Sequence, residues 1–173
     1  MKIGQHNRDT ETLRRPTTRT IVVLLLALTT CHTEPSEVTS ISLQRTACFG
    51  ICPVYAVTIY SDGLVEFHGE RFVESAGDFQ YRIEQEDFAS LAAFAEQIDF
   101  FSLDTEYRYK TGPNGERIAV SDLPSRITTV EKAGESKTVL NYFGGPEALT
   151  AFENLIDQLA RTADRIGSTA PSL

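Results

Sequence analysis

The sequence predicts an α+β fold, a single two-layer domain in which antiparallel β-hairpins or a meander carry two amphipathic helices packed on one face. Two turn-forming segments, Ser61–Gly63 and Lys132–Glu135, each separate stretches in which apolar residues alternate, and this pattern predicts hairpins. Each pair of stretches is followed by a segment in which apolar residues recur at helical spacing. The order of strands, helix, strands and helix is typical of an α+β domain.

The composition supports one folded domain with an acidic surface. A chain of 173 residues is long enough for one ordinary domain. Its apolar content of 41%, with 10 Phe and 6 Tyr, is sufficient for a hydrophobic core and excludes a disordered chain. The formal charge of −8 argues against a binder of the phosphate backbone, which needs a basic patch, so we expect no nucleic-acid partner.

The N-terminal segment has the pattern of an export signal. A basic cluster of Arg14, Arg15 and Arg19 precedes the apolar run Ile21–Leu28, which is too short to span a membrane as a helix but suits the core of a signal peptide. The run leads to Leu-Thr-Thr-Cys, which resembles the lipobox of bacterial lipoproteins, where the cysteine is lipidated. We therefore predict a signal peptide over residues 1–31 and a membrane anchor through lipid on Cys31, in the bacterial cell envelope, facing the periplasm or the exterior. A soluble secreted protein and an uncleaved anchor are the alternatives.

Two further cysteines, Cys48 and Cys52, lie four residues apart around Gly50. If Cys31 carries lipid, these two are an even pair in an oxidising compartment. A disulfide needs their Cα atoms within ~4.4–6.8 Å, so the segment between them must turn, and Gly50 supplies the backbone freedom. A structural disulfide that pins the start of the sheet is the leading interpretation. A redox pair, a metal site and two free thiols are the alternatives.

The domain is expected over residues 41–167, after a polar tether over 32–40. The strands predicted in its first half are 41–45, 54–60, 65–68 and 79–83. Tyr55 shares the buried face of its strand with Val57 and Ile59, whereas His68 falls on the solvent side. A helix follows, with a buried face of Phe88, Leu91, Ala95 and Ile98.

The second half begins with residues 102–125, which are long for a loop and rich in turn formers. They are expected to be a flexible excursion, with a surface for a partner as the alternative. A hairpin follows over 126–131 and 137–143, and then one last helix that ends at Gly167. The buried face predicted for this helix is Leu149, Phe152, Ile156 and Leu159. The tail 168–173 is expected to fray.

Motifs that bind phosphate or activate a nucleophile are missing from the sequence. We predict no cofactor, no metal and no catalytic residues. A Cys–His pair would have to combine His68 with Cys48 or Cys52. The carboxylate pairs on which a hydrolase could depend are Asp104 with Glu106 and Glu116 with Asp122.

The segment Leu43–Tyr55, continued by Ile59–Val65, resembles the opening of a bacterial family known as domain of unknown function 6438. Its members share a Cys-x-Gly-x-Cys-Pro-x-Tyr motif, an Asp-Gly hairpin and an acidic domain behind an export signal. The residues that match the motif are Cys48, Gly50, Cys52, Pro53 and Tyr55. The resemblance covers roughly residues 41–160 and implies the extent of the domain, without an activity, cofactor or catalytic residues.

These observations lead to one functional prediction and two alternatives. The leading prediction is a non-enzymatic lipoprotein of the cell envelope, whose domain binds an envelope protein or another envelope component. The first alternative is an extracytoplasmic thiol-disulfide protein that uses Cys48 and Cys52. The second is a hydrolase that works through acidic residues.

Overall fold

The computed structural model describes Met1 and residues 38–167. Apart from Met1, the predicted signal peptide with Cys31 lies outside the described residues, and so does the tail 168–173. No helix among the described residues is long and apolar enough to cross a membrane.

A mostly antiparallel sheet of seven strands forms one layer of the domain, in the order β4-β3-β2-β1-β8-β9-β5. The strands are β1 Val38–Arg45, β2 Val54–Tyr60, β3 Leu64–Arg71, β4 Gly77–Arg82, β5 Glu106–Tyr107, β8 Arg126–Lys132 and β9 Glu135–Asn141. Strand β1 lies between β2 and β8, so it joins the hairpins of the two halves of the chain. It begins at Val38, upstream of the Ile41 at which the domain was expected to start.

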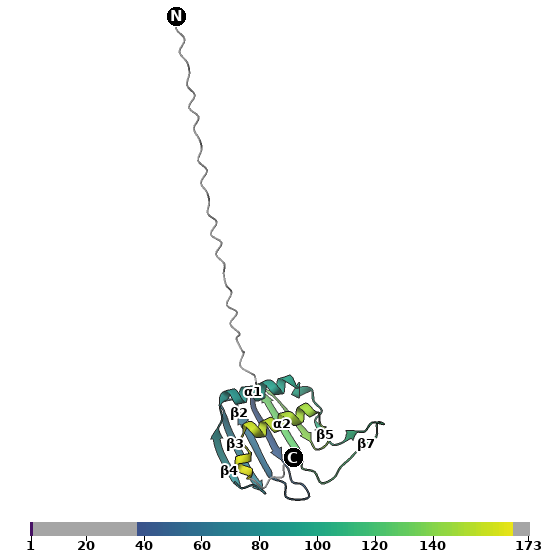
Figure 1. Ribbon diagram of the computed structural model, residues 1–173. Coiled ribbons are helices and arrows are strands. Elements are labelled where there is room, and N and C mark those ends of the chain that lie inside the picture. The colour runs from purple at the N-terminus through teal and green to yellow at the C-terminus, as the bar shows by residue number, and fades with distance from the viewer. Residues whose placement is uncertain (2–37, 168–173) are drawn as a thin grey trace. The chain divides into compact units, whose positions relative to one another are not determined.

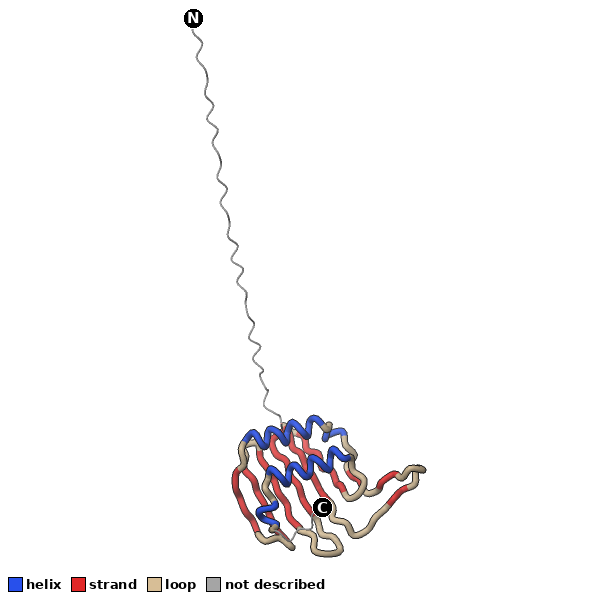
Figure 2. The backbone as a smooth tube through the Cα atoms, in the orientation of Figure 1, coloured by secondary structure: helices blue, strands red, loops and turns tan. Residues whose placement is uncertain are grey.

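Two helices, α1 Gln85–Gln97 and α2 Glu147–Leu159, form the second layer and lie on the same face of the sheet (Figures 1 and 2). The predicted α+β class is therefore confirmed. A short 3-10 helix, η1 Phe100–Ser102, follows α1, and a one-turn helix, α3 Ala163–Ile166, follows α2.

The core lies between the sheet and these helices. Every second residue of β1 and β2 points inward: Ile41, Leu43, Val57 and Ile59 are at most 1% exposed. The residues buried on the helices are Phe88, Leu91, Ala92, Ala95, Leu149, Phe152, Glu153 and Ile156. Burial of each large apolar side chain stabilises the fold by ~1.5–3 kcal/mol. The predicted inner faces are thus confirmed, except that Ile98 and Leu159 are only partly buried.

The opposite face of the sheet carries no helix and is polar. Thr129 and Thr138 form a hydrogen-bonded cross-strand pair there, 2.9 Å apart. His68 is exposed on this side of β3, as predicted, and its Nδ1 lies 2.5 Å from Asp78 Oδ1 on β4. An antiparallel sheet with one solvated face accounts for the alternation along its strands.

The Asp-Gly hairpin turn is confirmed, with Gly63 at φ 80°. The second hairpin turns more tightly than predicted, because Lys132 and Glu135 are already paired and only Ala133 and Gly134 lie between them. Of these two residues only Gly134 has a positive φ, at 82°, which is the pattern of a type II turn with glycine as its second central residue.

The segment 102–125 is more ordered than expected. Its strand β5 joins the main sheet in parallel with β9. Beyond it, β6 Lys110–Thr111 and β7 Arg117–Ile118 pair as a small hairpin that projects from the domain as an arm (Figure 1).

The last helix does not run to Gly167, and this prediction was wrong. Helix α2 ends at Leu159, and Arg161 takes a left-handed conformation at φ 50°. The Thr162 hydroxyl then donates to the carbonyl of Asp157 at 3.3 Å, and the Tyr81 hydroxyl donates to the carbonyl of Ala160. The first of these hydrogen bonds is local and the second comes from β4, and both satisfy carbonyls at the helix end, where the chain turns into α3.

Candidate functional site

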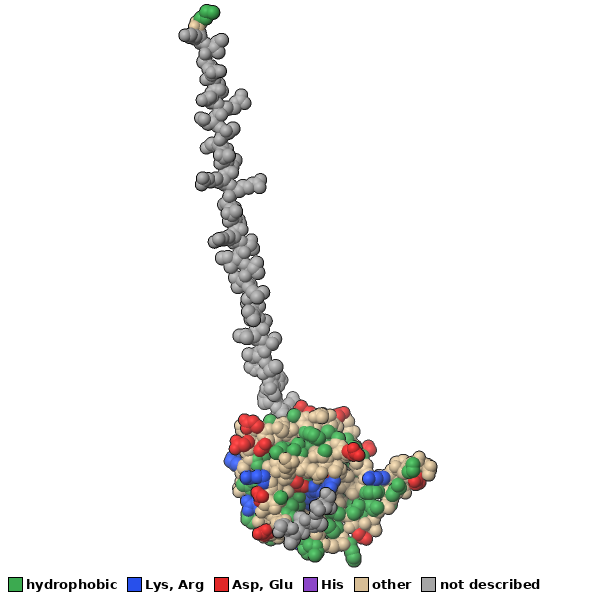
Figure 3. All heavy atoms as spheres, viewed as in Figure 1, with side chains coloured by type: hydrophobic (Ala, Val, Ile, Leu, Met, Phe, Trp, Pro, Cys, Tyr) green, Lys and Arg blue, Asp and Glu red, His purple; other side chains and the backbone are tan. Residues whose placement is uncertain are grey.

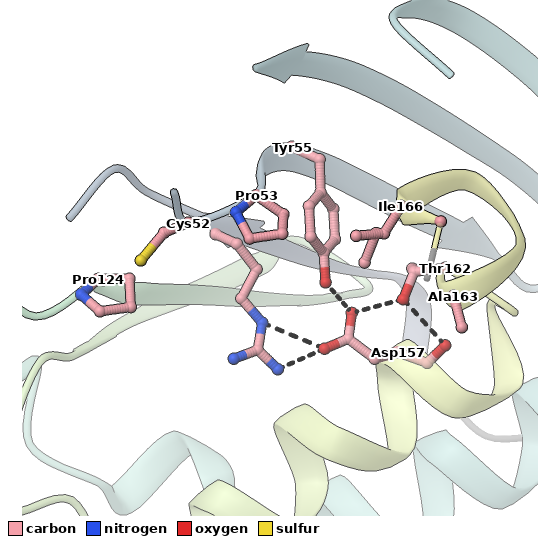
Figure 4. A pocket seen from close by; sticks show the side chains of 10 residues that line it. Cys52, Pro53, Tyr55, Pro124, Asp157, Thr162, Ala163 and Ile166 are labelled. Carbon is pink, nitrogen blue, oxygen red and sulfur yellow. Dashed lines mark hydrogen bonds and ion pairs between the residues drawn. The ribbon is translucent and has the colours of Figure 1, made fainter. Parts of the chain in front are cut away.

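A cavity of about 250 Å³ lies beside the break between α2 and α3 (Figure 4). Most of its wall is apolar. The lining residues are Arg45, Cys52, Pro53, Tyr55, Pro124, Asp157, Thr162, Ala163, Ile166 and Gly167. In Figure 4, Pro124, Cys52 and Pro53 lie on one side, and Thr162, Ala163 and Ile166 lie on the other. Three segments far apart in the sequence therefore build the cavity.

Polar residues reach this place because they form a row across the sheet. Arg45 ends β1 and pairs with Tyr55 on β2 and with Arg126 on β8. Arg126 in turn pairs with Asn141 on β9. Directly paired residues point to the same face of a sheet. The row therefore faces α2, at the end of the sheet where Cys48 and Cys52 lie.

Helix α2 supplies the opposite charges. Glu153 and Asp157 are four residues apart, so they lie on the same side of the helix. Asp157 pairs with Arg45, and Glu153 pairs with Arg126 at 3.3 Å. Each of these two arginines thus has its own carboxylate on α2.

Asp157 is the centre of the polar part of the cavity. Its Oδ2 accepts hydrogen bonds from Nε of Arg45, at 3.1 Å, and from Nη2 of the same guanidinium. Its Oδ1 accepts one from the Tyr55 hydroxyl, at 2.7 Å, and one from the Thr162 hydroxyl, at 3.2 Å. Figure 4 shows Asp157 between these two hydroxyls. Four donors occupy the acceptor sites of this carboxylate and leave it little capacity to accept a further hydrogen bond.

Glu153 is fully buried beside this cluster. Its Oε2 accepts from the Asn141 amide at 2.9 Å as well as from Arg126, and Thr128 lies 3.5 Å from its Oε1. Burial raises the pKa of the Glu153 carboxyl, although the hydrogen bond from Asn141 and the charge of Arg126 oppose this.

The same balance acts on the groups that bind Asp157. Burial of Arg45 opposes its charge and is the largest single effect, but the charge of Asp157, its hydrogen bond to Arg45 and the neighbouring Tyr55 and Glu153 together outweigh burial and raise the pKa of the guanidinium. Burial, and next the charge of Asp157, raise the pKa of Tyr55 well above its ordinary value. Arg45 therefore stays charged and Tyr55 stays protonated at neutral pH.

Cys48 and Cys52 form a disulfide, with their Cα atoms 5.8 Å apart. The segment between them turns as predicted, and the Gly50 N–H donates to the carbonyl of Cys48 at 3.0 Å. Of the predicted motif, Cys52, Pro53 and Tyr55 line the cavity, whereas Gly50 lies in the exposed loop.

The disulfide loop ends in two exposed apolar side chains. Phe49 is 90% exposed and Ile51 is 68% exposed. A second loop lies against the first, because the Phe49 N–H donates to the carbonyl of Asp122 at 3.3 Å and Thr46 bonds Ser125. Figure 3 shows apolar side chains protruding at the end of the domain opposite α1.

Other predicted chemistry does not assemble at this site. His68 lies on the helix-free face of the sheet, so the Cys–His pair does not form. Neither carboxylate pair proposed for a hydrolase lines the cavity. Among the described residues, no group of three His, Cys, Asp or Glu side chains is close enough together to hold a metal ion.

Sequence reasoning missed Arg45, Asp157, Glu153 and Thr162. A signal for two of them was present. Arg45 continues the alternation of the buried residues Ile41 and Leu43, and Glu153 lies within the apolar stripe of α2. A charged residue in phase with core residues is a candidate for a buried ion pair. The position of Thr162 depends on the helix break, which the sequence did not indicate.

The fold and the site define an acidic α+β domain with a disulfide-closed loop beside an apolar cavity. Residues 39–160 match the family described as Domain of unknown function (DUF6438), and the chain belongs to this family. A comparison with curated proteins found no match.

Proposed function

We propose that this protein is a non-enzymatic lipoprotein of the bacterial cell envelope, and that its domain binds a partner through the cavity beside the disulfide. The N-terminal arginines, the short apolar run and Cys31 support export and lipid anchoring, with the domain facing the periplasm or the exterior. A disulfide between the other two cysteines is consistent with an oxidising compartment.

The observation that carries the binding role is the chemistry of the cavity. Its wall is largely apolar, which is typical of sites that bind small molecules or protruding side chains. Its two charged residues, Arg45 and Asp157, neutralise each other. Tyr55 donates to the same carboxylate and is held protonated. These polar groups are arranged to stabilise one another rather than to transfer a proton, which supports binding over catalysis.

A thiol-disulfide role is the second candidate, and one observation favours it. Cys52 lines the cavity, so a thiol carried by a bound partner would approach the disulfide there. Such a protein would oxidise a substrate dithiol to a disulfide by way of a mixed disulfide, and its own Cys48–Cys52 disulfide would be reduced to two thiols.

Intact mass spectrometry of the exported protein tests the envelope assignment. We expect a lipid mass on Cys31, and alkylation of Cys48 and Cys52 only after reduction. A chain without lipid would overturn the anchor. Alkylation of both cysteines without reduction would overturn the structural disulfide and favour thiol chemistry.

Methyl NMR of the full chain tests the cavity, with 4-methylphenol as the probe. We expect chemical-shift changes at the methyl groups of Ala163 and Ile166 and none at Val65 in the core. A cavity-filling Ala163→Trp variant should lose the change at Ile166. Absence of any shift at these methyl groups would remove the support for a binding site.

A further inference from the structure

The disulfide loop is an apolar projection that is held in place before it meets a partner. Phe49 and Ile51 expose 90% and 68% of their surface, although each would be expected to avoid water. The Cys48–Cys52 disulfide and the hydrogen bond from Phe49 to Asp122 restrain the loop. A loop whose backbone is already restrained loses little backbone entropy on binding, which suits a loop that presents an aromatic anchor to an interface.

The cavity is the complementary feature, and it lies beside the projection. Cys52 belongs to both, because it closes the loop and lines the cavity. Pro124 also lines the cavity and follows Leu123, which is 40% exposed. A volume of about 250 Å³ is larger than the ~150 Å³ of an apolar protein cavity that accommodates benzene. The cavity is therefore large enough for the ring of a phenylalanine.

The two loops beside the cavity are poor in charge, which matters for two acidic chains, whereas α3 on the other side of the cavity carries Asp164 and Arg165. Residues 46–53 contain no charged side chain, and residues 118–125 contain only Asp122. The whole chain carries a formal charge of −8, so copies repel each other elsewhere. Since charges beyond ~10 Å are largely screened at ordinary ionic strength, contact through these two loops is opposed by little like-charge repulsion.

The disulfide loop lies far from Val38, the first residue of β1. Val38, where the chain joins the proposed lipid tether, begins β1, and the disulfide loop follows the other end of the same strand. An eight-residue strand separates the two ends by roughly 25 Å. The loop and the cavity thus lie at the end of β1 that is remote from Val38.

We propose that two copies of this chain associate face to face, and that each inserts Phe49 into the cavity of the other. This inference rests on the proposed function, because it names the partner of the same cavity. A twofold interface needs a self-complementary surface, in which residue i contacts residue j and the reverse. An apolar projection beside an apolar cavity meets that requirement when the axis passes between them.

Sedimentation velocity of the full chain carrying Cys31→Ser, with its disulfide verified by mass, measures this association. We expect a concentration-dependent dimer. Phe49→Ser and Ala163→Trp should each raise the dissociation constant of the dimer by about tenfold or more. Both copies in such a dimer carry the substitution, so both insertions are lost. Tyr109→Ser is the matched control: Tyr109 is 46% exposed on the arm, and its loss should leave the association unchanged. Ala163 is exposed, so tryptophan there should not prevent folding, which circular dichroism checks.

A mixture of the two variants separates insertion from general adhesion. The Phe49→Ser copy keeps its cavity and the Ala163→Trp copy keeps its projection, so a mixed dimer retains one of the two insertions. We expect the mixture to associate more tightly than either variant alone. An equal affinity, or a wild-type chain that stays monomeric at its highest soluble concentration, would overturn the proposal. If that monomer still binds 4-methylphenol in the cavity, the binding function stands and only the dimer fails.

Discussion

Removal of the Asp157 carboxylate is expected to be among the most damaging single changes in this domain. The side chains of Arg45 and Asp157 are only 9% and 17% exposed, so water cannot replace the carboxylate fully. Loss of one partner of a buried ion pair costs ~3–5 kcal/mol, and the partial exposure of Asp157 places this case near the lower end. We therefore expect Asp157→Asn to lower the free energy of unfolding by ~3 kcal/mol.

Urea denaturation of the full chain, followed by far-ultraviolet circular dichroism, measures this loss. With an m-value of ~2 kcal/mol/M, a loss of ~3 kcal/mol lowers the urea midpoint by ~1.5 M. Asp164→Asn is the matched control, because Asp164 is an exposed carboxylate on the neighbouring α3 and its change should stay within ~0.5 kcal/mol.

A double variant separates the destabilisation caused by an unpaired buried charge from the contribution of the intact Arg45–Asp157 ion pair to the free energy of unfolding. Arg45→Met with Asp157→Leu replaces both ions by apolar groups of similar volume, and we expect most of the lost stability to return. The reasoning would be refuted if Asp157→Asn cost less than ~0.5 kcal/mol, or if the double variant were as unstable as the sum of its single changes.

Three further predictions concern the buried carboxylate, the disulfide and the core. Burial raises the pKa of the Glu153 carboxyl above its ordinary value of 4.5, so the folded state binds more protons than the unfolded state. The contribution of Glu153 to stability therefore falls as the pH rises above 4.5. The stability of Glu153→Gln relative to wild type should therefore improve between pH 4.5 and pH 7 in urea titrations, and an unchanged difference would contradict the raised pKa. Replacing Cys48 and Cys52 by Ser should cost ~2 kcal/mol, because the disulfide closes a short loop, and dithiothreitol should have the same effect on the wild type alone. Phe152→Ala should lower the free energy of unfolding by ~3–5 kcal/mol in the same assay, because the Phe152 ring is fully buried and its centroid lies 5.8 Å from those of Phe94 and Phe100. A loss below ~1 kcal/mol would show that the core is not packed around Phe152.

Local patterns in the sequence predicted most of the fold. The alternation of apolar residues placed β2 and β3 in the sheet and assigned Tyr55 and Phe67 to the core and His68 to solvent. Helical spacing identified the inner faces of α1 and α2. Turn chemistry located the Asp62-Gly63 hairpin. These features depend on residues that are near in the chain, so sequence periodicity reports them directly.

The sequence by itself determined the α+β class, the hairpins, the helix faces, the proximity of Cys48 to Cys52 and the acidity of the surface. Only the tertiary structure decided the site. Arg45 and Asp157 are 112 residues apart, and they meet because the register of β1 and the position of α2 bring them together. The break after α2 likewise depends on Tyr81 of β4, whose hydroxyl donates a hydrogen bond to the carbonyl of Ala160. Such contacts follow from the packing of whole elements, and no local spacing encodes them.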